Sequence, residues 1–338
     1  MAVMSKTSLY PPELEDRFKQ PEGWRWHAFN TPDGRRIRFG TVSPKNNVPD
    51  AVVVVLQGLN EFSEKYYELA SDLVANNMSF WMMDWYGQGK SGRTHKNKYK
   101  RHTNTIKQDV KDLHYFITEY ITHSAVHPDV GRIPLVMLAH SMGGNIGLHY
   151  LNKHPDSFAC AAFSAPMCGI YALKILPFKL SLLLTSFFRR LAGKSYVFGG
   201  KDWHPEIETL MMKEQLSSDP IRREIESMWL NHDEELRIGN VTFGWLHEAN
   251  MSCNSLWCKA DMKGIKTPCL FALAEKDKLV NNNITRDIIK RMPNATTIEI
   301  EGAKHEILFE RDQIRNKFLT AFSELLTASD IKDKVVPF

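Results

Sequence analysis

The sequence predicts an α/β protein with a mostly parallel central sheet, helices on both faces and an inserted helical cap. Short apolar segments rich in β-branched residues alternate with segments of helical length, which is typical of βαβ units. The alternation stops near residue 166 and resumes near residue 262, and 338 residues suit one large domain that carries an insertion. We therefore expect a first core part over residues 1–165, a cap over residues 166–261 and a second core part over residues 262–338.

The first core part is expected to begin with an antiparallel hairpin. Residues 24–29 and 36–39 flank the sequence TPDG at 31–34, in which Pro and Gly stand where a chain reversal needs them. Residues 51–56, with the sequence AVVVVL, and residues 78–83 are apolar almost throughout. Such segments are typical of strands that are covered on both faces.

The remaining elements continue the alternation. Apolar residues recur every three or four positions at Ile106, Val110, Leu113, Ile117 and Tyr120, which predicts an amphipathic helix with Thr105 and Gln108 as its capping box. Further strands are expected at residues 135–139, 158–163, 269–273 and 297–300, and further helices at residues 145–154, 284–292 and 310–326.

Composition and charge exclude several classes of protein. Hydrophobic residues make up 43% and charged residues 24%, which is close to a soluble globular average and excludes a disordered chain. The net charge of +4 is too small to indicate a nucleic-acid partner. The most apolar stretch, residues 170–188, is interrupted by Lys174, Pro177 and Lys179, so we expect no helix that crosses a bilayer.

The N-terminal residues and the cysteines favour a cytoplasmic setting. Residues 1–20 lack the apolar run of a secretory signal. Five cysteines are an odd number, which favours reduced thiols. Cys253 and Cys258 form a C-x4-C pair without a second pair of ligands, so we interpret them as packing residues and expect no zinc site.

A serine follows the strand expected at residues 135–139. The sequence His140-Ser141-Met142-Gly143-Gly144 leads from this strand into a helix. So sharp a strand-to-helix turn is strained and needs small neighbours, and it lifts the serine hydroxyl clear of the sheet. Ala139, the smallest substitute, replaces the first glycine of the G-x-S-x-G pattern. We interpret Ser141 as a nucleophile rather than as an incidental serine in a glycine-rich turn.

A nucleophilic serine needs a histidine base and a carboxylate that orients the base. On a sheet of this kind both are expected after the serine, in loops beyond strands. Asp277 and His305 occupy such positions in the second core part. Glu275 is the rival acid, but it lies closer to the strand end and has less loop to reach across. His140 is the rival base, but adjacent residues on a sharp turn point in different directions.

Acyl transfer also needs donors for the oxyanion, each worth about 3–4 kcal/mol. One donor is expected to be the backbone N–H of Met142, the residue after the nucleophile. The other should come from residues 57–61, directly after the strand AVVVVL, where the Leu59 N–H is our candidate. Gly58 permits a turn that aims N–H groups inward, although a glycine that simply ends the strand would look the same. This chemistry requires no cofactor and no metal.

A second glycine-rich segment, GQGKSG at residues 87–92, matches the G-x-G-x-x-G pattern of dinucleotide sites. That pattern must open a helix at once, whereas the following residues have no apolar period before Ile106. The segment also resembles the end of a phosphate-binding P-loop, but the leading glycine would fall at Asp84. We interpret residues 84–92 as a tight structural loop.

Five segments together resemble one protein family. They are QGLNEFSEKY (57–66), DWYGQGKSG (84–92), AHSMGG (139–144), AEKDKLV (274–280) and GAKHEILFERD (302–312). In this order they resemble the α/β-hydrolase superfamily and, within it, the bacterial lysophospholipase and monoacylglycerol-lipase branch. The last segment is most similar to the inner-membrane-associated lysophospholipases of Gram-negative bacteria.

The resemblance implies the α/β-hydrolase fold with a helical cap between the sixth and seventh strands. It also implies a triad of Ser141, Asp277 and His305 and an oxyanion hole at Leu59 and Met142. The chain departs from the family at Gln57, where histidine is usual, and at Asn60 and Phe62, where glycine and histidine are common. Because the hole uses backbone groups, we expect these changes to alter loop shape and substrate preference more than basic competence.

The function expected from these observations is cleavage of the acyl ester of a single-chain lipid, a lysophospholipid or a monoacylglycerol, through an acyl-enzyme. Transacylation would follow if a second alcohol replaced water. Two alternatives stay open: a small-molecule carboxylesterase without a lipid role, and a non-catalytic hydrolase-fold protein that binds a ligand. Headgroup, chain length and oligomeric state are not determined by the sequence.

Two segments suggest contact with lipid. Residues 170–188 combine apolar bulk with lysines, which suits an acyl-chain tunnel, a membrane surface or ordinary packing against the core. Five positive charges lie within nine residues, at Arg93, Lys96, Lys98, Lys100 and Arg101. We hypothesise that both segments contact an anionic membrane, on the inner face of the cytoplasmic membrane.

Overall fold

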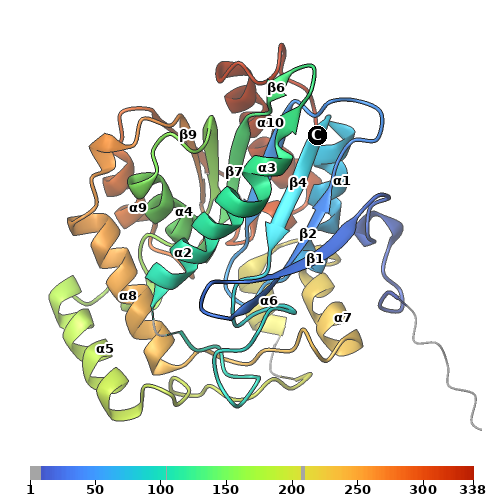
Figure 1. Ribbon diagram of the computed structural model, residues 1–338. Coiled ribbons are helices and arrows are strands. Elements are labelled where there is room, and N and C mark those ends of the chain that lie inside the picture. The colour runs from blue at the N-terminus through green and yellow to red at the C-terminus, as the bar shows by residue number, and fades with distance from the viewer. Residues whose placement is uncertain (1–8, 104, 207–209) are drawn as a thin grey trace, which may run out of the picture.

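The computed structural model describes residues 9–103, 105–206 and 210–338 (Figure 1). Eight strands form one sheet. Their spatial order is β1 (Arg25–Asn30), β2 (Arg36–Val42), β4 (Met78–Met83), β3 (Ala51–Leu56), β7 (Leu135–His140), β8 (Cys160–Ser164), β9 (Cys269–Ala274) and β10 (Ala295–Ile300). The pairs β1–β2 and β2–β4 are antiparallel and all other pairs are parallel, so the predicted hairpin and parallel sheet are confirmed. A separate two-stranded ribbon joins β5 (Val126–His127) to β6 (Gly131–Arg132).

Helices cover both faces of the sheet. On one face lie α1 (Tyr67–Ala75) and α10 (Asp312–Ala328). On the other lie α2 (Ile106–Phe116), α4 (Met142–Lys153) and α9 (Asn282–Ile289), and a π-helical turn, Ile117–Ile121, connects α2 to α3 (Thr122–Ser124) (Figure 1). Short 3-10 turns are η1 (Asp16–Phe18), η2 (Ser63–Tyr66), η4 (Tyr171–Leu173), η5 (Arg222–Glu224), η6 (Met262–Gly264) and η7 (Ile307–Phe309).

Strand β3 is apolar at every position because both of its faces are buried. Val53 and Val55 join the apolar cluster that contains Phe318 and Phe322 of α10. Val52 and Val54 point to the opposite face and join the cluster that contains helix α2. Successive side chains of a strand alternate between the faces, so a strand with a core on each side needs apolar residues throughout.

Between β8 and β9 the described residues add no strand to the eight-stranded sheet. This segment contains α5 (Phe178–Ala192), α6 (Leu210–Leu216), α7 (Ile225–His232) and α8 (Phe243–Cys258). Helix α8 packs against α4 and α2 of the core, while α5 packs against α8 and lies further from the sheet (Figure 1). No helix among the described residues is long and apolar enough to cross a membrane.

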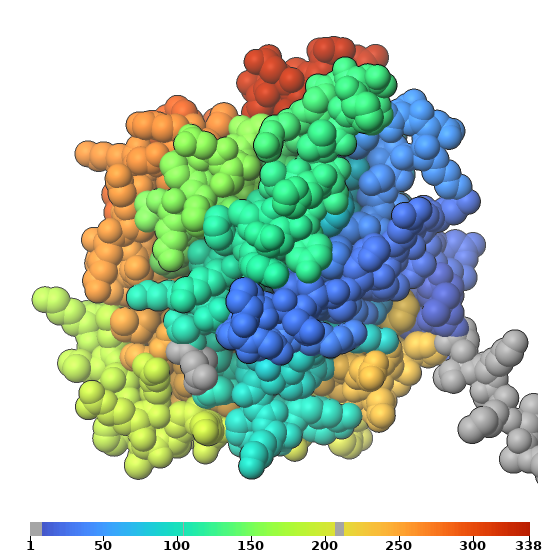
Figure 2. Space-filling view, viewed as in Figure 1, coloured from blue at the N-terminus to red at the C-terminus, as the bar shows by residue number. Residues whose placement is uncertain are grey.

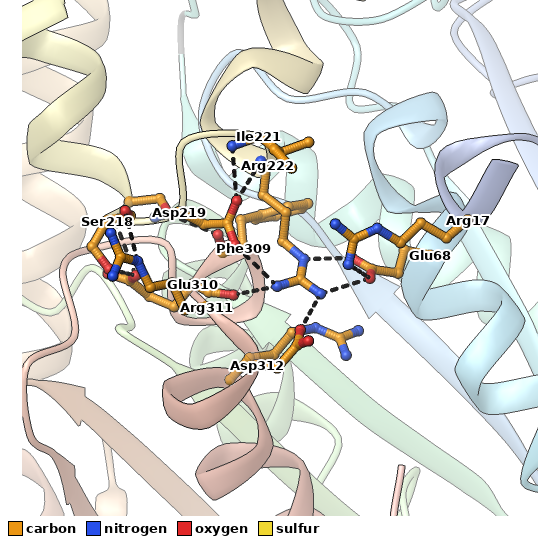
Figure 3. Close-up of polar contacts among 12 residues, drawn as sticks. Arg17, Glu68, Ser218, Asp219, Ile221, Arg222, Phe309, Glu310, Arg311 and Asp312 are labelled. Atoms are coloured by element: carbon orange, nitrogen blue, oxygen red, sulfur yellow. Dashed lines mark hydrogen bonds and ion pairs between the residues drawn. The ribbon is translucent and has the colours of Figure 1, made fainter. Parts of the chain in front are cut away.

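Arg222 joins this segment to the core. Its buried guanidinium donates to both carboxylate oxygens of Glu68 in α1, at 2.8 and 2.7 Å, and to the carbonyl oxygen of Glu310 at 2.7 Å (Figure 3). The Glu310 carboxylate in turn accepts the backbone N–H groups of Ser218 at 2.9 Å and Lys304 at 2.8 Å. The chain segment before α7 is therefore attached to the loop that contains His305.

Three details differ from the sequence-based expectations. Helix α4 begins at Met142, three residues earlier than expected, and α1 was not expected. The capping box of α2 is wrong: the Thr105 hydroxyl accepts the N–H of Lys107, and the Gln108 side chain donates to Asp112 instead of reaching back. Local side-chain geometry decides this choice, and the S/T-x-x-Q spacing alone does not.

Candidate active site

Ser141 lies on the sharp turn between β7 and α4. Its backbone has φ 50° and ψ −115°, a conformation that is rare for residues other than glycine. The two following glycines make room for this turn. A Cβ at Gly143 would lie 2.1 Å from the carbonyl oxygen of Leu56, and a Cβ at Gly144 would lie 2.6 Å from Cβ of Pro166. The small residues after Ser141 are thus required by close backbone approach.

Ser141, His305 and Asp277 form one hydrogen-bonded chain. The Ser141 hydroxyl lies 2.8 Å from Nε2 of His305, and Nδ1 of His305 lies 2.8 Å from Oδ2 of Asp277. The second oxygen of Asp277 accepts the backbone N–H groups of Leu279 at 2.8 Å and Val280 at 3.0 Å. A carboxylate accepts only, so Nδ1 carries the proton toward Asp277 and Nε2 is free to accept from the serine. This is the geometry that general-base catalysis by an imidazole requires.

Burial and charge act in opposite directions on this pair. Burial favours neutral His305, but the Asp277 carboxylate, together with Glu306 and Glu61, outweighs it and raises the pKa of His305 above its usual range. Burial likewise opposes ionisation of Asp277, but the facing imidazole and the two backbone N–H groups keep its pKa below the usual range. Asp277 is therefore ionised at neutral pH, as an orienting carboxylate must be.

The two rival residues, Glu275 and His140, take no part in the hydrogen-bonded chain Ser141–His305–Asp277. Glu275 is exposed, and its carboxylate accepts the backbone N–H of Gly302 at 2.7 Å. Nδ1 of His140 lies 3.0 Å from the carbonyl oxygen of Ser164 and so donates to it. Burial lowers the pKa of His140 to about 4, which keeps this ring neutral. Neither side chain is hydrogen-bonded to Ser141.

The two expected oxyanion donors have no competing partner in the described part of the chain. No protein acceptor there is bonded to the backbone N–H of Leu59 or of Met142. Met142 is the first residue of α4, where a helix leaves N–H groups unpaired. Leu59 lies in the wall of the cavity that contains Ser141. Both groups are available to a substrate oxygen.

A buried charge cluster, which the sequence analysis missed, lies beside this site. The ammonium group of Lys65 is 2.9 Å from Glu61, 2.8 Å from Glu226 and 2.7 Å from Glu306. A cation thus already occupies the space among the three carboxylates. Glu61 also accepts the backbone N–H of Gly58 at 2.5 Å, which ties the cluster to the Leu59 loop. The available signal was the run of charges in EFSEKY at 61–66, so close to the expected oxyanion loop.

The cavity in front of Ser141 has a volume of about 420 Å³. Its apolar lining residues include Met167, Ile170, Ile238, Trp245 and Leu279. Its polar and charged lining residues include Asn60, Glu61, Lys213, Glu226 and Lys278. A lining with both kinds of residue suits an amphipathic ligand with one apolar and one polar end.

The five basic residues at 93–101 do not form one exposed patch. Lys96 and Lys98 are exposed, but Arg101 is completely buried. Arg93 donates to the carbonyl oxygens of Ser91 and Glu235. The hypothesis that all five attract an anionic surface is therefore wrong for Arg101, because a loop without apolar periodicity gave no sign of its burial.

Several known proteins are similar to this chain. The family described as "Serine aminopeptidase, S33" matches residues 47–312. Lysophospholipase L2 of Escherichia coli strain K12 is 31% identical over 283 residues, which cover 80% of this chain and 79% of that protein. Monoacylglycerol lipase of Mycolicibacterium smegmatis is 27% identical over 146 residues, which cover 41% of this chain and 46% of that protein. A soluble variant of monoglyceride lipase from Saccharomyces cerevisiae, solved with a substrate analogue, has a TM-score of 0.70 at 17% identity and covers 92% of this chain and 98% of its own.

Proposed function

Since the chain belongs to the S33 serine hydrolase family and has the α/β-hydrolase fold, we propose that it cleaves the acyl ester of a single-chain lipid, a lysophospholipid or a monoacylglycerol. It is an ester hydrolase, because its relatives by sequence are lysophospholipases and monoacylglycerol lipases. The observation that carries the proposal is the hydrogen-bonded chain Ser141–His305–Asp277, in which Ser141 and His305 line a cavity with many apolar residues.

In the proposed reaction His305 removes the hydroxyl proton of Ser141 while the serine oxygen attacks the ester carbonyl. Asp277 orients the imidazole and stabilises its charged form. The backbone N–H groups of Leu59 and Met142 hold the oxyanion of the tetrahedral intermediate. His305 then gives the proton to the leaving alcohol, and the acyl-enzyme remains on Ser141.

Water completes the reaction by the same steps in reverse order. His305 takes a proton from water, the hydroxide adds to the acyl-enzyme carbonyl, and Ser141 leaves with the proton that His305 returns. If a second alcohol enters instead of water, the acyl group is transferred to it. The ratio of free fatty acid to acylated acceptor, measured with a labelled lysolipid, determines the balance of hydrolysis and transacylation.

The apolar lining residues support an acyl chain as the ligand of the cavity. We infer that the segment at residues 166–261 acts as a cap, because it supplies Met167, Ile170, Ile238 and Trp245 to that lining. The charged lining residues Lys213, Glu226 and Lys278 would then face the polar end of the lipid.

Helix α5 supports contact with a lipid surface, because its polarity is inverted. Its buried residues are Ser181 and Thr185, which bond to Asn250 and His247 of α8. Its outward residues are large and apolar: Leu180, Leu183, Leu184, Phe187 and Leu191 are 42–72% exposed. Apolar residues on the outside of a helix are typical of a membrane-facing surface. Figure 2 shows the region of α5, in yellow-green, projecting from the body of the molecule.

Basic residues surround this apolar face. Lys174, Lys179, Arg190 and Lys194 are exposed at or near the two ends of α5. Each such residue near an anionic surface contributes about 1 kcal/mol of attraction. We propose that α5 and its flanks, rather than the whole 93–101 segment, dock on an anionic membrane.

Vesicle flotation tests the docking. The wild type is expected to float with phosphatidylglycerol vesicles, and the double variant Leu183→Ser, Phe187→Ser is expected to stay in solution. Val130→Ser is the matched control, because this valine is also 63% exposed but lies outside α5. Equal flotation of the wild type and the double variant would overturn the docking proposal.

Substrate specificity tests the main proposal and separates it from the two alternatives. Purified protein is offered lysophosphatidylethanolamine, lysophosphatidylcholine, monoacylglycerol and short p-nitrophenyl esters. A lipid esterase prefers the long-chain substrates, whereas a carboxylesterase without a lipid role prefers the short esters. A ligand-binding protein turns over none of them and leaves Ser141 unlabelled by a fluorophosphonate probe.

A further inference from the structure

The loop that carries Leu59 has to be held in an unusual shape. It follows β3, and its residue Asn60 has a positive φ of 65°, a left-handed conformation that costs free energy for a residue other than glycine. The donor at Leu59 is useful only if its N–H stays where the oxyanion forms, because catalysis depends on donors fixed in advance. Neighbouring groups must therefore restrain residues 58–61.

The side chain of Gln88 provides this restraint. Its Nε2 donates to the carbonyl oxygens of Gly58 and Glu61, both at 3.0 Å. Its Oε1 accepts the backbone N–H of Asn60, also at 3.0 Å. One fully buried amide thus holds the backbone immediately before and after Leu59. Gln88 belongs to the segment GQGKSG, which the sequence analysis interpreted only as a structural loop.

Arg101 sets the orientation of this amide. Its Nε donates to Oε1 of Gln88 at 3.0 Å. A guanidinium has no acceptor, so the amide oxygen must face it and the amide nitrogen must face the two carbonyl groups. In the described part of the chain no carboxylate lies within salt-bridge distance of Arg101, although its side chain is completely buried, and the charge that favours its ionised form is that of buried Asp109. Burial outweighs this attraction and lowers the pKa of Arg101 to about 10, so the buried guanidinium is held at a cost in free energy.

Arg101 also reaches the second donor. Its terminal nitrogen lies 4.0 Å from Sδ of Met142, the residue whose N–H is the other oxyanion candidate. The one guanidinium therefore contacts the Leu59 loop through Gln88 and the start of α4 through the Met142 side chain. Both halves of the oxyanion hole converge on one buried cation.

We propose that Gln88 and Arg101 are positioning residues that hold the two oxyanion donors in register, a role that rests on the proposed function. Neither residue touches the substrate in this proposal. They act through the backbone at residues 58–61 and through Met142.

Two substitutions of Gln88 test the amide. Gln88→Glu keeps an acceptor for Asn60 and Arg101 but places an oxygen against the carbonyl groups of Gly58 and Glu61. Gln88→Met removes all these bonds at similar volume. We expect both to lower kcat for a short p-nitrophenyl ester by about 10- to 1,000-fold with little change in KM, since loss of a single oxyanion donor costs about 10²–10³.

Two substitutions of Arg101 test the guanidinium. Arg101→Met removes charge and donors, whereas Arg101→Lys keeps one donor that can reach Gln88. We expect Arg101→Lys to retain several-fold more activity than Arg101→Met. Lys96→Gln is the matched control, because this lysine is exposed in the same segment, and its kcat should equal that of the wild type.

The decisive readout separates positioning from folding. Rates are normalised to the sites that a fluorophosphonate labels at completion, and inhibition by butylboronic acid, which forms a tetrahedral adduct on serine, is measured in parallel. If Gln88 and Arg101 are positioning residues, their substitutions should weaken boronate binding in proportion to the loss of kcat/KM. Normal kcat and normal boronate binding per labelled site in all four variants would overturn the proposal, even if their melting temperatures fall. If the wild type itself shows no labelling and no turnover, the proposed function has failed instead.

Discussion

Asp277 and His305 form a buried pair whose charge state decides whether Ser141 can lose its proton. His305 must be neutral to accept it, and the Asp277 carboxylate favours the charged imidazole. The pKa of His305 is therefore raised, and activity should increase as pH rises through a value above 6.5, the ordinary value for histidine. Above that inflection kcat/KM should be level. The pH profile for a neutral short ester measures this directly.

Asp277→Asn should move the inflection to lower pH. Without the Asp277 carboxylate, burial, which disfavours the charged ring, is opposed only by the weaker attraction of Glu306 and Glu61. The rate should also fall by about 10⁴-fold, as expected when the orienting carboxylate of a triad becomes an amide. Glu275→Gln serves as the control, because Glu275 lies outside the hydrogen-bonded chain. An unchanged inflection in Asp277→Asn would contradict the assignment of Asp277 as the partner.

Ser141→Ala should remove turnover while the fold stays intact. If the triad acts as a unit, kcat falls by up to about 10⁶-fold. The substitution also removes the group that accepts the acyl chain, so no acyl-enzyme should accumulate. Mass spectrometry after addition of a slow ester detects that intermediate in the wild type. Residual covalent labelling of the variant at another serine would show that the nucleophile lies elsewhere.

At the scale of elements, Arg222 should contribute strongly to stability. It is 2% exposed and bonds Glu68, which is itself mostly buried, through both carboxylate oxygens. Removal of one partner of a buried ion pair typically costs about 3–5 kcal/mol, because the other charge stays buried without compensation. Arg222→Met should therefore lower the free energy of unfolding by a few kcal/mol, measured by urea denaturation.

Arg223→Met is the matched control for this prediction. Arg223 is the next residue, but its contacts with Glu214 and Glu224 are 3.9 and 3.7 Å long and partly exposed. Exposed pairs of this kind contribute about 1 kcal/mol or less. If Arg222→Met lowers the free energy of unfolding no more than Arg223→Met does, the Arg222 contacts in Figure 3 do not attach the segment at residues 166–261 to the core.

The elements that follow from local pattern were predictable, and those that depend on distant contacts were not. Residues 51–56 and 78–83 are strands as expected, because burial on both faces leaves a continuous apolar run. The serine turn was expected because its glycines are neighbours in sequence. Helix α1 was missed, although Leu69, Ala70 and Leu73 are buried, because it is short and its apolar residues alternate with Glu68 and Asp72.

Arg101 shows most clearly where sequence reasoning ends. Four other basic residues precede it within nine positions, so the sequence analysis hypothesised that the whole segment contacts an anionic membrane. Its burial results from contacts with Gln88 and Met142, which lie 13 and 41 residues away. Hydrophobic periodicity in the sequence does not predict contacts between residues so far apart. The same holds for Lys65, whose partners Glu226 and Glu306 become adjacent only in the folded chain.

At the scale of the whole molecule, the cavity and the apolar face of α5 are linked along the chain. Ile170 and Ala172 lie in the cavity wall, and Ile175, three residues beyond Ala172, is 82% exposed. The cavity wall and the segment that leads into α5 are therefore only a few residues apart in the chain. This arrangement requires both parts of the molecule, because Ser141 lies at the start of α4 whereas the exposed apolar helix α5 belongs to the segment at residues 166–261.

We expect anionic vesicles to increase the hydrolysis of a long-chain lysolipid but not that of a short soluble ester. Docking raises the local concentration of the long-chain substrate at the cavity, whereas the short ester reaches Ser141 from water in either case. The gain should fall when salt is raised from 0.1 M to 1 M, because the screening length shrinks from about 10 Å to about 3 Å. It should also be small with uncharged phosphatidylcholine vesicles and absent in Leu183→Ser, Phe187→Ser. If vesicles increase both activities equally, they act on the catalytic residues through a change in the cap rather than by delivering substrate, and the apolar face of α5 would need a different explanation.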